Sequence, residues 1–122
     1  MSKTQILIVE DDEILVRIIS WRLTNLGYEV CGKAASGAEA MDLLVAVKPD
    51  LVLMDINIKG DMDGIETAGM IKKEFRLPVV FLTSHSDGQT LERTKAMRPD
   101  GFVLKPFGDN DLRVAIELAL NK

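Results

Sequence analysis

The sequence predicts an α/β protein in which a parallel sheet carries helices on both of its faces. Short apolar runs alternate with amphipathic stretches from one end of the chain to the other, which is the pattern of repeated βα units. The central runs are apolar at consecutive positions, as expected of strands buried on both faces of a sheet. A length of 122 residues and a hydrophobic content of 47% indicate one domain, residues 1–122, with a sizeable core.

Five short apolar runs are predicted to be strands. They lie at about Gln5–Glu10, Tyr28–Lys33, Asp50–Met54, Pro78–Leu82 and Asp100–Leu104. The single cysteine, Cys31, falls within the second run and can form no internal disulfide. We therefore expect a buried, reduced thiol, which fits a cytoplasmic setting.

Five amphipathic stretches between and after these runs are predicted to be helices. They lie at about Asp12–Leu26, Gly37–Val47, Gly64–Phe75, Gly88–Met97 and Asp109–Asn121. Asp12 and Ser36 are candidate N-caps for the first two helices. Gly27 follows the first helix as a C-terminal stop, and Pro49 lies shortly beyond the end of the second.

The fourth of these helices is predicted to be weakly anchored. Its clearly apolar residues, Leu91, Ala96 and Met97, do not share one helical face. Little apolar area then holds it to the sheet, so we expect it to be among the least stable elements and the easiest to shift. In the alternative interpretation, Thr94 and the stems of neighbouring basic residues cover the sheet adequately.

Composition excludes several classes of function. The net charge of -4 argues against direct nucleic-acid binding, which needs clustered Lys and Arg. The chain has no apolar stretch near the roughly 18 residues of a membrane span, and its first residues do not form a signal peptide. We therefore expect a cytoplasmic protein that does not act on membranes.

Chemically compatible groups follow the ends of four predicted strands. Glu10 and Asp11 follow the first strand, Asp55 the third, Thr83 the fourth and Lys105 the fifth. Because the carboxyl ends of parallel strands meet at one edge of a sheet, we expect these side chains to lie close together. The sequence therefore predicts a ligand site at this edge.

The acids in this group suit a hard divalent cation, Mg²⁺ or Mn²⁺, which prefers oxygen ligands. Asp12 fits the helix-cap position, so Glu10 and Asp11 are the preferred metal pair beside Asp55. Acids gathered in this way would repel one another without a cation.

The remaining groups suit a phosphoryl group. The Asp55 carboxylate can act as a nucleophile that forms an aspartyl phosphate, while Lys105 and the Thr83 hydroxyl can bind phosphoryl oxygens. Taken singly, each has a simpler interpretation as a loop acid, a surface lysine or a turn hydroxyl. Their joint occurrence at four strand ends favours the site.

At these residues the chain resembles the receiver domain of two-component response regulators, in its single-domain, chemotaxis-regulator-like form. The resemblance extends over essentially the whole chain. Its motifs are Ile6–Glu13, Pro49–Ile56, Met62–Glu66, Pro78–Ser84 and Gly101–Phe107. It implies a flavodoxin-like, doubly wound five-stranded parallel sheet of order 2-1-3-4-5 with five helices.

The resemblance also implies a role for each site residue. Asp55 would accept a phosphoryl group from the phosphohistidine of a sensor histidine kinase. The groups that would arrange the magnesium ion are Glu10, Asp11, Asp55 and the backbone carbonyl of Asn57. Thr83 and Phe102 resemble the family's switch pair, and Lys105 its phosphate-binding lysine. The Lys105–Pro106 bond resembles the family's cis peptide, which an X-Pro bond permits at small cost.

Two features depart from the family pattern. The loop that follows Asp55 is one residue longer, with Lys59 where the family has proline, so its path and its contacts with a kinase are expected to differ. The switch aromatic is Phe102 in place of tyrosine, so it lacks a hydroxyl that could hold one rotamer.

We therefore interpret the protein as a phosphorylation-activated signalling switch that changes its partner-binding surface. It would not be an enzyme in the ordinary sense, because self-phosphorylation and slow self-dephosphorylation are its only reactions. We expect Asn57 and His85, each two residues beyond a site residue, to influence the lifetime of the phosphoryl group. The alternatives are a phosphorylation-independent binding module and a metal-dependent phosphohydrolase, although the latter usually needs an aspartate at the position of Asn57.

The expected partners are the sensor kinase, a downstream protein target or fused output domain, and a second copy of the chain on activation. We expect binding at the face formed by the fourth helix, fifth strand and fifth helix. On the fifth helix, Val114 and Leu118 lie away from the predicted core stripe. The chain ends at Lys122, just after this helix, so it is either a stand-alone regulator or a piece of a longer chain.

Overall fold

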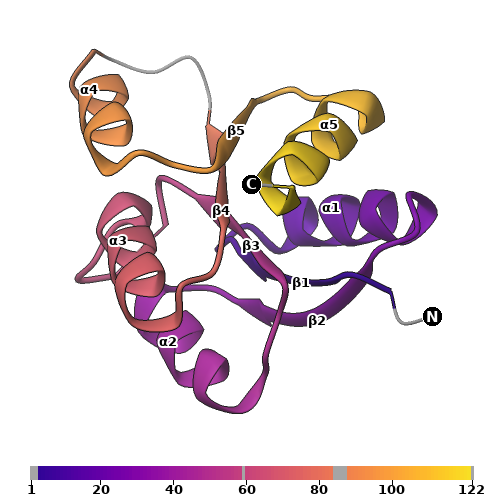
Figure 1. Ribbon diagram of the computed structural model, residues 1–122, viewed down its shortest axis with the longest axis horizontal. Helices are drawn as coiled ribbons and strands as arrows, with labels where there is room; N and C mark the ends of the chain where they lie inside the picture. The colour runs from indigo at the N-terminus through magenta and orange to yellow at the C-terminus, as the bar shows by residue number, and fades with distance from the viewer. Residues whose placement is uncertain (1–2, 59, 84–87, 122) are drawn as a thin grey trace.

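A computed structural model describes residues 3–58, 60–83 and 88–121, in which strands and helices alternate along the chain (Figure 1). The strands are β1 (Gln5–Val9), β2 (Glu29–Ala34), β3 (Leu51–Asp55), β4 (Val79–Thr83) and β5 (Gly101–Leu104). The helices are α1 (Glu13–Asn25), α2 (Gly37–Ala46), α3 (Gly64–Phe75), α4 (Gly88–Met97) and α5 (Asp109–Leu120). Each predicted element is present, and its ends lie within one residue of the prediction.

The strands form a parallel sheet in the order β2-β1-β3-β4-β5, which confirms the predicted topology. After β2 the chain passes β1 and forms β3 on the other side of it. Strands β1 and β3 are therefore adjacent in the middle of the sheet. Every strand therefore points its carboxyl end to the same edge, where open α/β sheets bind their ligands.

Alternate residues of the strands point to opposite faces, and each face has its own apolar core. Helices α1 and α5 cover one face, and α2 and α3 cover the other (Figure 1). The strand residues beneath α1 and α5 are Ile6, Ile8, Leu51, Leu53, Val80, Leu82 and Val103. Those beneath α2 and α3 are Leu7, Val9, Ala34, Val52, Met54, Val79 and Phe81. This burial on both faces explains the unbroken apolar runs of the central strands.

Side-chain caps start the helices near the sheet edge. The Asp12 carboxylate accepts hydrogen bonds from the backbone N–H groups of Ile14 (3.0 Å) and Leu15 (3.3 Å), which confirms it as the α1 cap. Asp63 caps α3 through a capping box with Glu66. These caps satisfy N–H groups that the first helical turn leaves without a partner.

The burial predicted for Cys31 is wrong. Its thiol is half-exposed, because β2 is an edge strand of the sheet and most of its residues are not fully covered.

The structure is consistent with a loosely held α4. In this helix Thr94 is buried and Met97 is half-buried against the α2–α3 core, whereas Ala96 is exposed. Leu91 is outside the side chains that the structure describes. Figure 1 places α4 on the same side of the sheet as α3, and the neighbouring β5 residue Phe102 is 54% exposed.

Among the helices described, none is long and apolar enough to cross a membrane.

Two leucines of α5 provide a test of this packing. Leu112 is fully buried, whereas Leu118 is 65% exposed. We expect Leu112→Ala to lower the free energy of unfolding by about 2–5 kcal/mol, because it removes buried methyl groups and leaves a cavity. The matched control Leu118→Ala should change it by about 0.5 kcal/mol or less. Urea denaturation measures both, and equal effects would contradict the observed packing.

Candidate functional site

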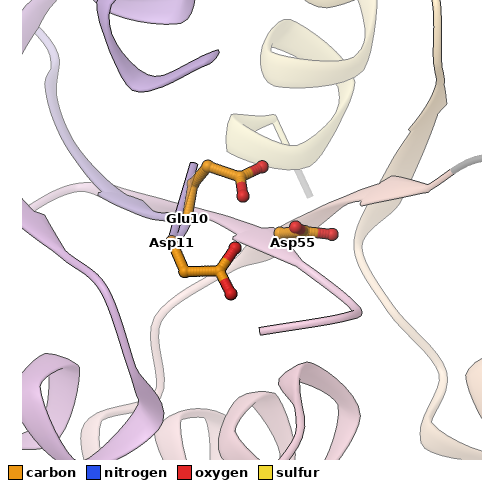
Figure 2. Close-up of side chains that lie close together, drawn as sticks. All are labelled: Glu10, Asp11 and Asp55. Carbon is orange, nitrogen blue, oxygen red and sulfur yellow. The ribbon is translucent and has the colours of Figure 1, made fainter. Parts of the chain in front are cut away.

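Three carboxylates from separate segments meet at the carboxyl edge of the sheet. Glu10 and Asp11 follow β1, and Asp55 is the last residue of β3. One oxygen from each lies within 4.8 Å of the other two, and Figure 2 shows the three side chains gathered at the ends of these strands. Glu10 and Asp55 are buried and Asp11 is half-buried, so two of the charges have lost most of their contact with water.

Backbone hydrogen bonds continue past the strand ends and fix these positions. The Glu10 N–H donates to the Ala34 carbonyl (2.9 Å), and the Ile56 N–H donates to the Leu82 carbonyl (3.3 Å). The Lys105 N–H donates to the Thr83 carbonyl (2.7 Å). The backbone at each of these site residues is therefore tied to the neighbouring strand.

Lys105 faces the acids. Its Nζ lies 3.5 Å from Oε1 of Glu10 and 3.5 Å from Oδ1 of Asp55. Both distances are long for a hydrogen-bonded ion pair, so the ammonium group lies between the two carboxylates without closing tightly on either. The peptide bond between Lys105 and Pro106 is cis.

The start of α3 packs against the backbone of Asp55 and Ile56. Its Oδ1 accepts a hydrogen bond from the Asn57 N–H (3.1 Å), and the Gly64 N–H donates to the Ile56 carbonyl (2.9 Å). A Cβ at position 64 would overlap the Asp55 carbonyl oxygen and lie 2.7 Å from Cα of Ile56. This close approach of Gly64 to the Asp55 backbone was not predicted from the sequence. The signal that could have indicated it is a glycine directly after the helix cap Asp63.

Crowding changes the titration of Glu10. Burial, followed by the side-chain hydrogen bond with Asp55, raises the pKa of the Glu10 carboxyl from its ordinary 4.5 to about 7. The backbone N–H of Asp12 and the charge of Lys105 oppose this shift. Near neutral pH, without a cation, Glu10 is therefore partly protonated.

The donor set fits a hard divalent cation. Its atoms are carboxylate oxygens only, and their mutual repulsion is the kind that a dication relieves. Glu10, Asp11 and Asp55 would hold such an ion, and the half-exposure of Asp11 leaves room for water ligands. The N–H of Asn57 is engaged with Asp55, and its side chain is exposed.

The other predicted site residues lie on the β4–β5 side of the sheet. Thr83 is the last residue of β4, is 9% exposed and pairs with Leu104. Phe102 projects outward from β5 and is largely exposed. Lys59 and His85 are outside the residues that the structure describes.

The sequence matches one family of known proteins. The family model for the response regulator receiver domain matches residues 6–117. The transcriptional regulatory protein PdtaR of Mycobacterium tuberculosis is 36% identical over 118 residues, which are 97% of this chain and 57% of PdtaR. The response regulator protein VraR of Staphylococcus aureus is 35% identical over 114 residues, 92% of this chain and 54% of VraR. The chain thus spans little more than half the length of these curated relatives.

Solved structures also match. The signal receiver domain of a modulated diguanylate cyclase from Desulfovibrio desulfuricans has a TM-score of 0.92 and 35% identity, covering 98% of this chain and 95% of that one. The receiver domain of NtrX from Brucella abortus has a TM-score of 0.86 and 28% identity, covering 96% and 98%.

The raised pKa of Glu10 predicts a pH-dependent magnesium affinity. Below pH 7 a proton must leave Glu10 before it can act as a ligand, so affinity should fall about tenfold from pH 8 to pH 6. Isothermal titration with Mg²⁺ measures this. Glu10→Gln should bind more weakly and lose the dependence, whereas Asp11→Asn should bind more weakly and retain it. An affinity of the unaltered protein that is constant over this range would contradict the assignment.

Proposed function

This chain belongs to the family of response regulator receiver domains, and we propose that it is a phosphorylation-activated signalling switch whose phosphoacceptor is Asp55. The observation that carries the proposal is the position of Asp55. It ends a central strand, it is 5% exposed, and it faces both the acid pair and the ammonium group of Lys105.

The proposed donor is the phosphohistidine of a sensor histidine kinase. An Asp55 carboxylate oxygen attacks phosphorus, and the phosphorus–nitrogen bond breaks. The histidine ring, protonated on its other nitrogen, leaves as neutral imidazole, and Asp55 becomes an acyl phosphate. A divalent cation bound by the acids supplies neutralisation of the phosphoryl charge.

The chain's own residues contribute position and charge. The Asn57 N–H orients one Asp55 oxygen, and the start of α3 blocks movement of the Asp55 backbone away from the donor. Lys105 lies 3.5 Å from Asp55 and carries a compact charge that can turn toward a phosphoryl oxygen. Thr83, at the end of the adjacent strand, presents a hydroxyl at the same edge.

The residue set favours a switch over a phosphohydrolase. Receiver domains of response regulators are generally signalling switches and not true enzymes. Asn57 stands where a phosphohydrolase usually has a second aspartate, and an amide cannot serve as its general acid or base. Slow self-dephosphorylation is therefore the expected fate of the acyl phosphate. A phosphorylation-independent module is disfavoured because the acids, the hydroxyl and the lysine are all present.

Phosphorylation is proposed to change a surface. The phosphoryl group carries roughly 1.5 to 2 negative charges in place of the single charge of the Asp55 carboxylate, and the added charge draws Thr83 and Lys105 toward it. Movement of Thr83 lets Phe102 turn inward, and α4 and β5 shift between two packings. The affected surface is a groove of about 720 Å³ between β5 and α5. Its exposed apolar residues are Phe102, Leu104, Val114 and Leu118.

This groove is the proposed site of partner binding. Its lining combines these apolar residues with polar ones, among them Lys105, Asn110 and Asp111, and such a combination is typical of a protein–protein interface. The proposed occupant is a downstream protein, an output domain of the kind implied by the longer relatives, or a second copy of the chain.

Asp55 should be the sole phosphoacceptor. With acetyl phosphate and Mg²⁺, mass spectrometry should show addition of one phosphoryl group, and Asp55→Asn should abolish it. The matched control Asp12→Asn should label normally, because asparagine also caps a helix and Asp12 is not among the clustered acids. Undiminished labelling of Asp55→Asn would refute the assignment.

The groove should mediate association of the phosphorylated protein. Val114 and Leu118 are 43% and 65% exposed, so glutamate at both positions should leave the fold intact. We expect phosphorylation to promote self-association in analytical ultracentrifugation, and Val114→Glu with Leu118→Glu to weaken it at least tenfold. The control pair, Ile14→Glu with Val45→Glu, replaces apolar residues elsewhere that are still more exposed. Equal association of both double variants would place the interface outside this groove.

A further inference from the structure

Among the contacts that hold α4 and the residues just after it to the rest of the described structure, two polar connections differ in burial. Near its middle, Nη2 of Arg93 lies 2.7 Å from Oδ2 of Asp63. Both side chains of this pair are substantially exposed, at 50% and 32%. Ion pairs of this kind are weak and exchange readily with water.

The second connection, at the C-terminal end of α4, is less exposed. Arg98 follows the last turn of the helix in a left-handed conformation, and Asp100 lies two residues further along the chain. Oδ2 of Asp100 accepts hydrogen bonds from Nζ of Lys72 (2.6 Å) and from the Val79 N–H (2.9 Å). The Asp100 side chain is only 14% exposed, and its own N–H donates to the Val79 carbonyl (3.2 Å). This end of α4 is therefore firmly attached to α3 and β4.

The Arg93–Asp63 ion pair is close in the chain to the residue that contacts the proposed phosphoacceptor, Asp55. Asp63 is the N-cap of α3: its Oδ1 accepts from the Glu66 N–H (2.9 Å), and its own N–H donates to Oε1 of Glu66 (3.1 Å). The next residue, Gly64, lies against the carbonyl of Asp55. Arg93 thus links α4 to the segment that backs Asp55.

Exposed apolar residues lie on the sheet face that α4 shares. Phe102 and Leu104 alternate along β5 with Val103, which packs beneath α1 and α5, so they project to the opposite face, the side of α3 and α4. They are 54% and 42% exposed. A helix that moved over them would bury apolar area.

We propose that α4 pivots about its Asp100 end, and that the Arg93–Asp63 ion pair is the releasable restraint that holds it in the unphosphorylated state. The part of this inference that concerns phosphorylation rests on the proposed function. Release of the restraint raises the population of the shifted α4. By linkage, it then raises the affinity for any phosphoryl group or mimic that favours the shifted state.

Amide hydrogen exchange of the unphosphorylated protein tests the restraint without involving phosphorylation. We expect Arg93→Gln to speed exchange across α4 about two- to fivefold, the factor that corresponds to an exposed ion pair. The matched control Lys95→Gln removes an exposed charge of the same helix that forms no ion pair with the side chains that the structure describes, and it should leave exchange unchanged. Asp63→Asn keeps a capping residue but loses the charge, so it should act like Arg93→Gln.

The double variant distinguishes a specific pair from two separate effects. Arg93→Gln combined with Asp63→Asn should exchange no faster than either single variant, since the second change has no partner left to remove. Additive acceleration, or equal exchange in Arg93→Gln and Lys95→Gln, would overturn the proposed restraint.

Beryllium trifluoride, a phosphoryl mimic, tests the link to the site. In the presence of Mg²⁺, Arg93→Gln should bind it about two- to fivefold more tightly than Lys95→Gln does, matching the change in exchange. Faster exchange with unchanged affinity would overturn the coupling to Asp55. Failure of the unaltered protein to be phosphorylated on Asp55 would refute the proposed function, while the exchange experiment would still decide the restraint.

Discussion

Crowding of negative charge at one edge of the sheet is the constraint on which the rest of the site depends. Glu10, Asp11 and Asp55 lie within 4.8 Å of one another, and two of them are buried. Such an arrangement is unfavourable unless the backbone imposes it and a cation or proton relieves it. The parallel sheet imposes it, because β1 and β3 are neighbours with the same direction and their ends cannot separate.

Two features of the structure relieve this repulsion, and a bound dication would relieve it further. Lys105 places a positive charge between Glu10 and Asp55 without engaging either closely, so it is available to a newly added anion. Because the pKa of Glu10 is raised, a proton on this carboxyl can reduce the negative charge of the site when no cation is bound. The remaining negative charge favours a dication, and a dication in turn favours a phosphoryl group. Electrostatic repulsion in the empty site therefore favours binding of both a dication and a phosphoryl group.

The sequence predicted the fold well because several local signals agreed. Unbroken apolar runs marked the buried strands, and caps such as Asp12 and Ser36 marked the helix starts, so each element was located to within a residue. The gathering of Glu10, Asp11 and Asp55 followed from parallel topology alone. The exposure of Cys31 is not encoded in the local apolar pattern: it follows from the edge position of β2, which the implied sheet order contained but the burial prediction did not use. The contact of Gly64 with the Asp55 carbonyl and the pairing of Arg93 with Asp63 depend on tertiary placement, which no local pattern encodes.

The two sides of the sheet differ in a way that suits a switch. Asp55 and Glu10 extend from β3 and β1, whose apolar residues are completely buried beneath well-packed helices, so the proposed acceptor is held in a fixed position. Thr83 and Lys105 extend from β4 and β5, and β5 is a short edge strand with exposed Phe102 and Leu104 beside a loosely held α4. A charge added to the fixed side can therefore change the packing of the loose side at little cost, since few buried contacts must be broken there. The chemistry needs a rigid acceptor and the signal needs a movable surface, and this fold provides both by covering one edge of the sheet less completely than its centre.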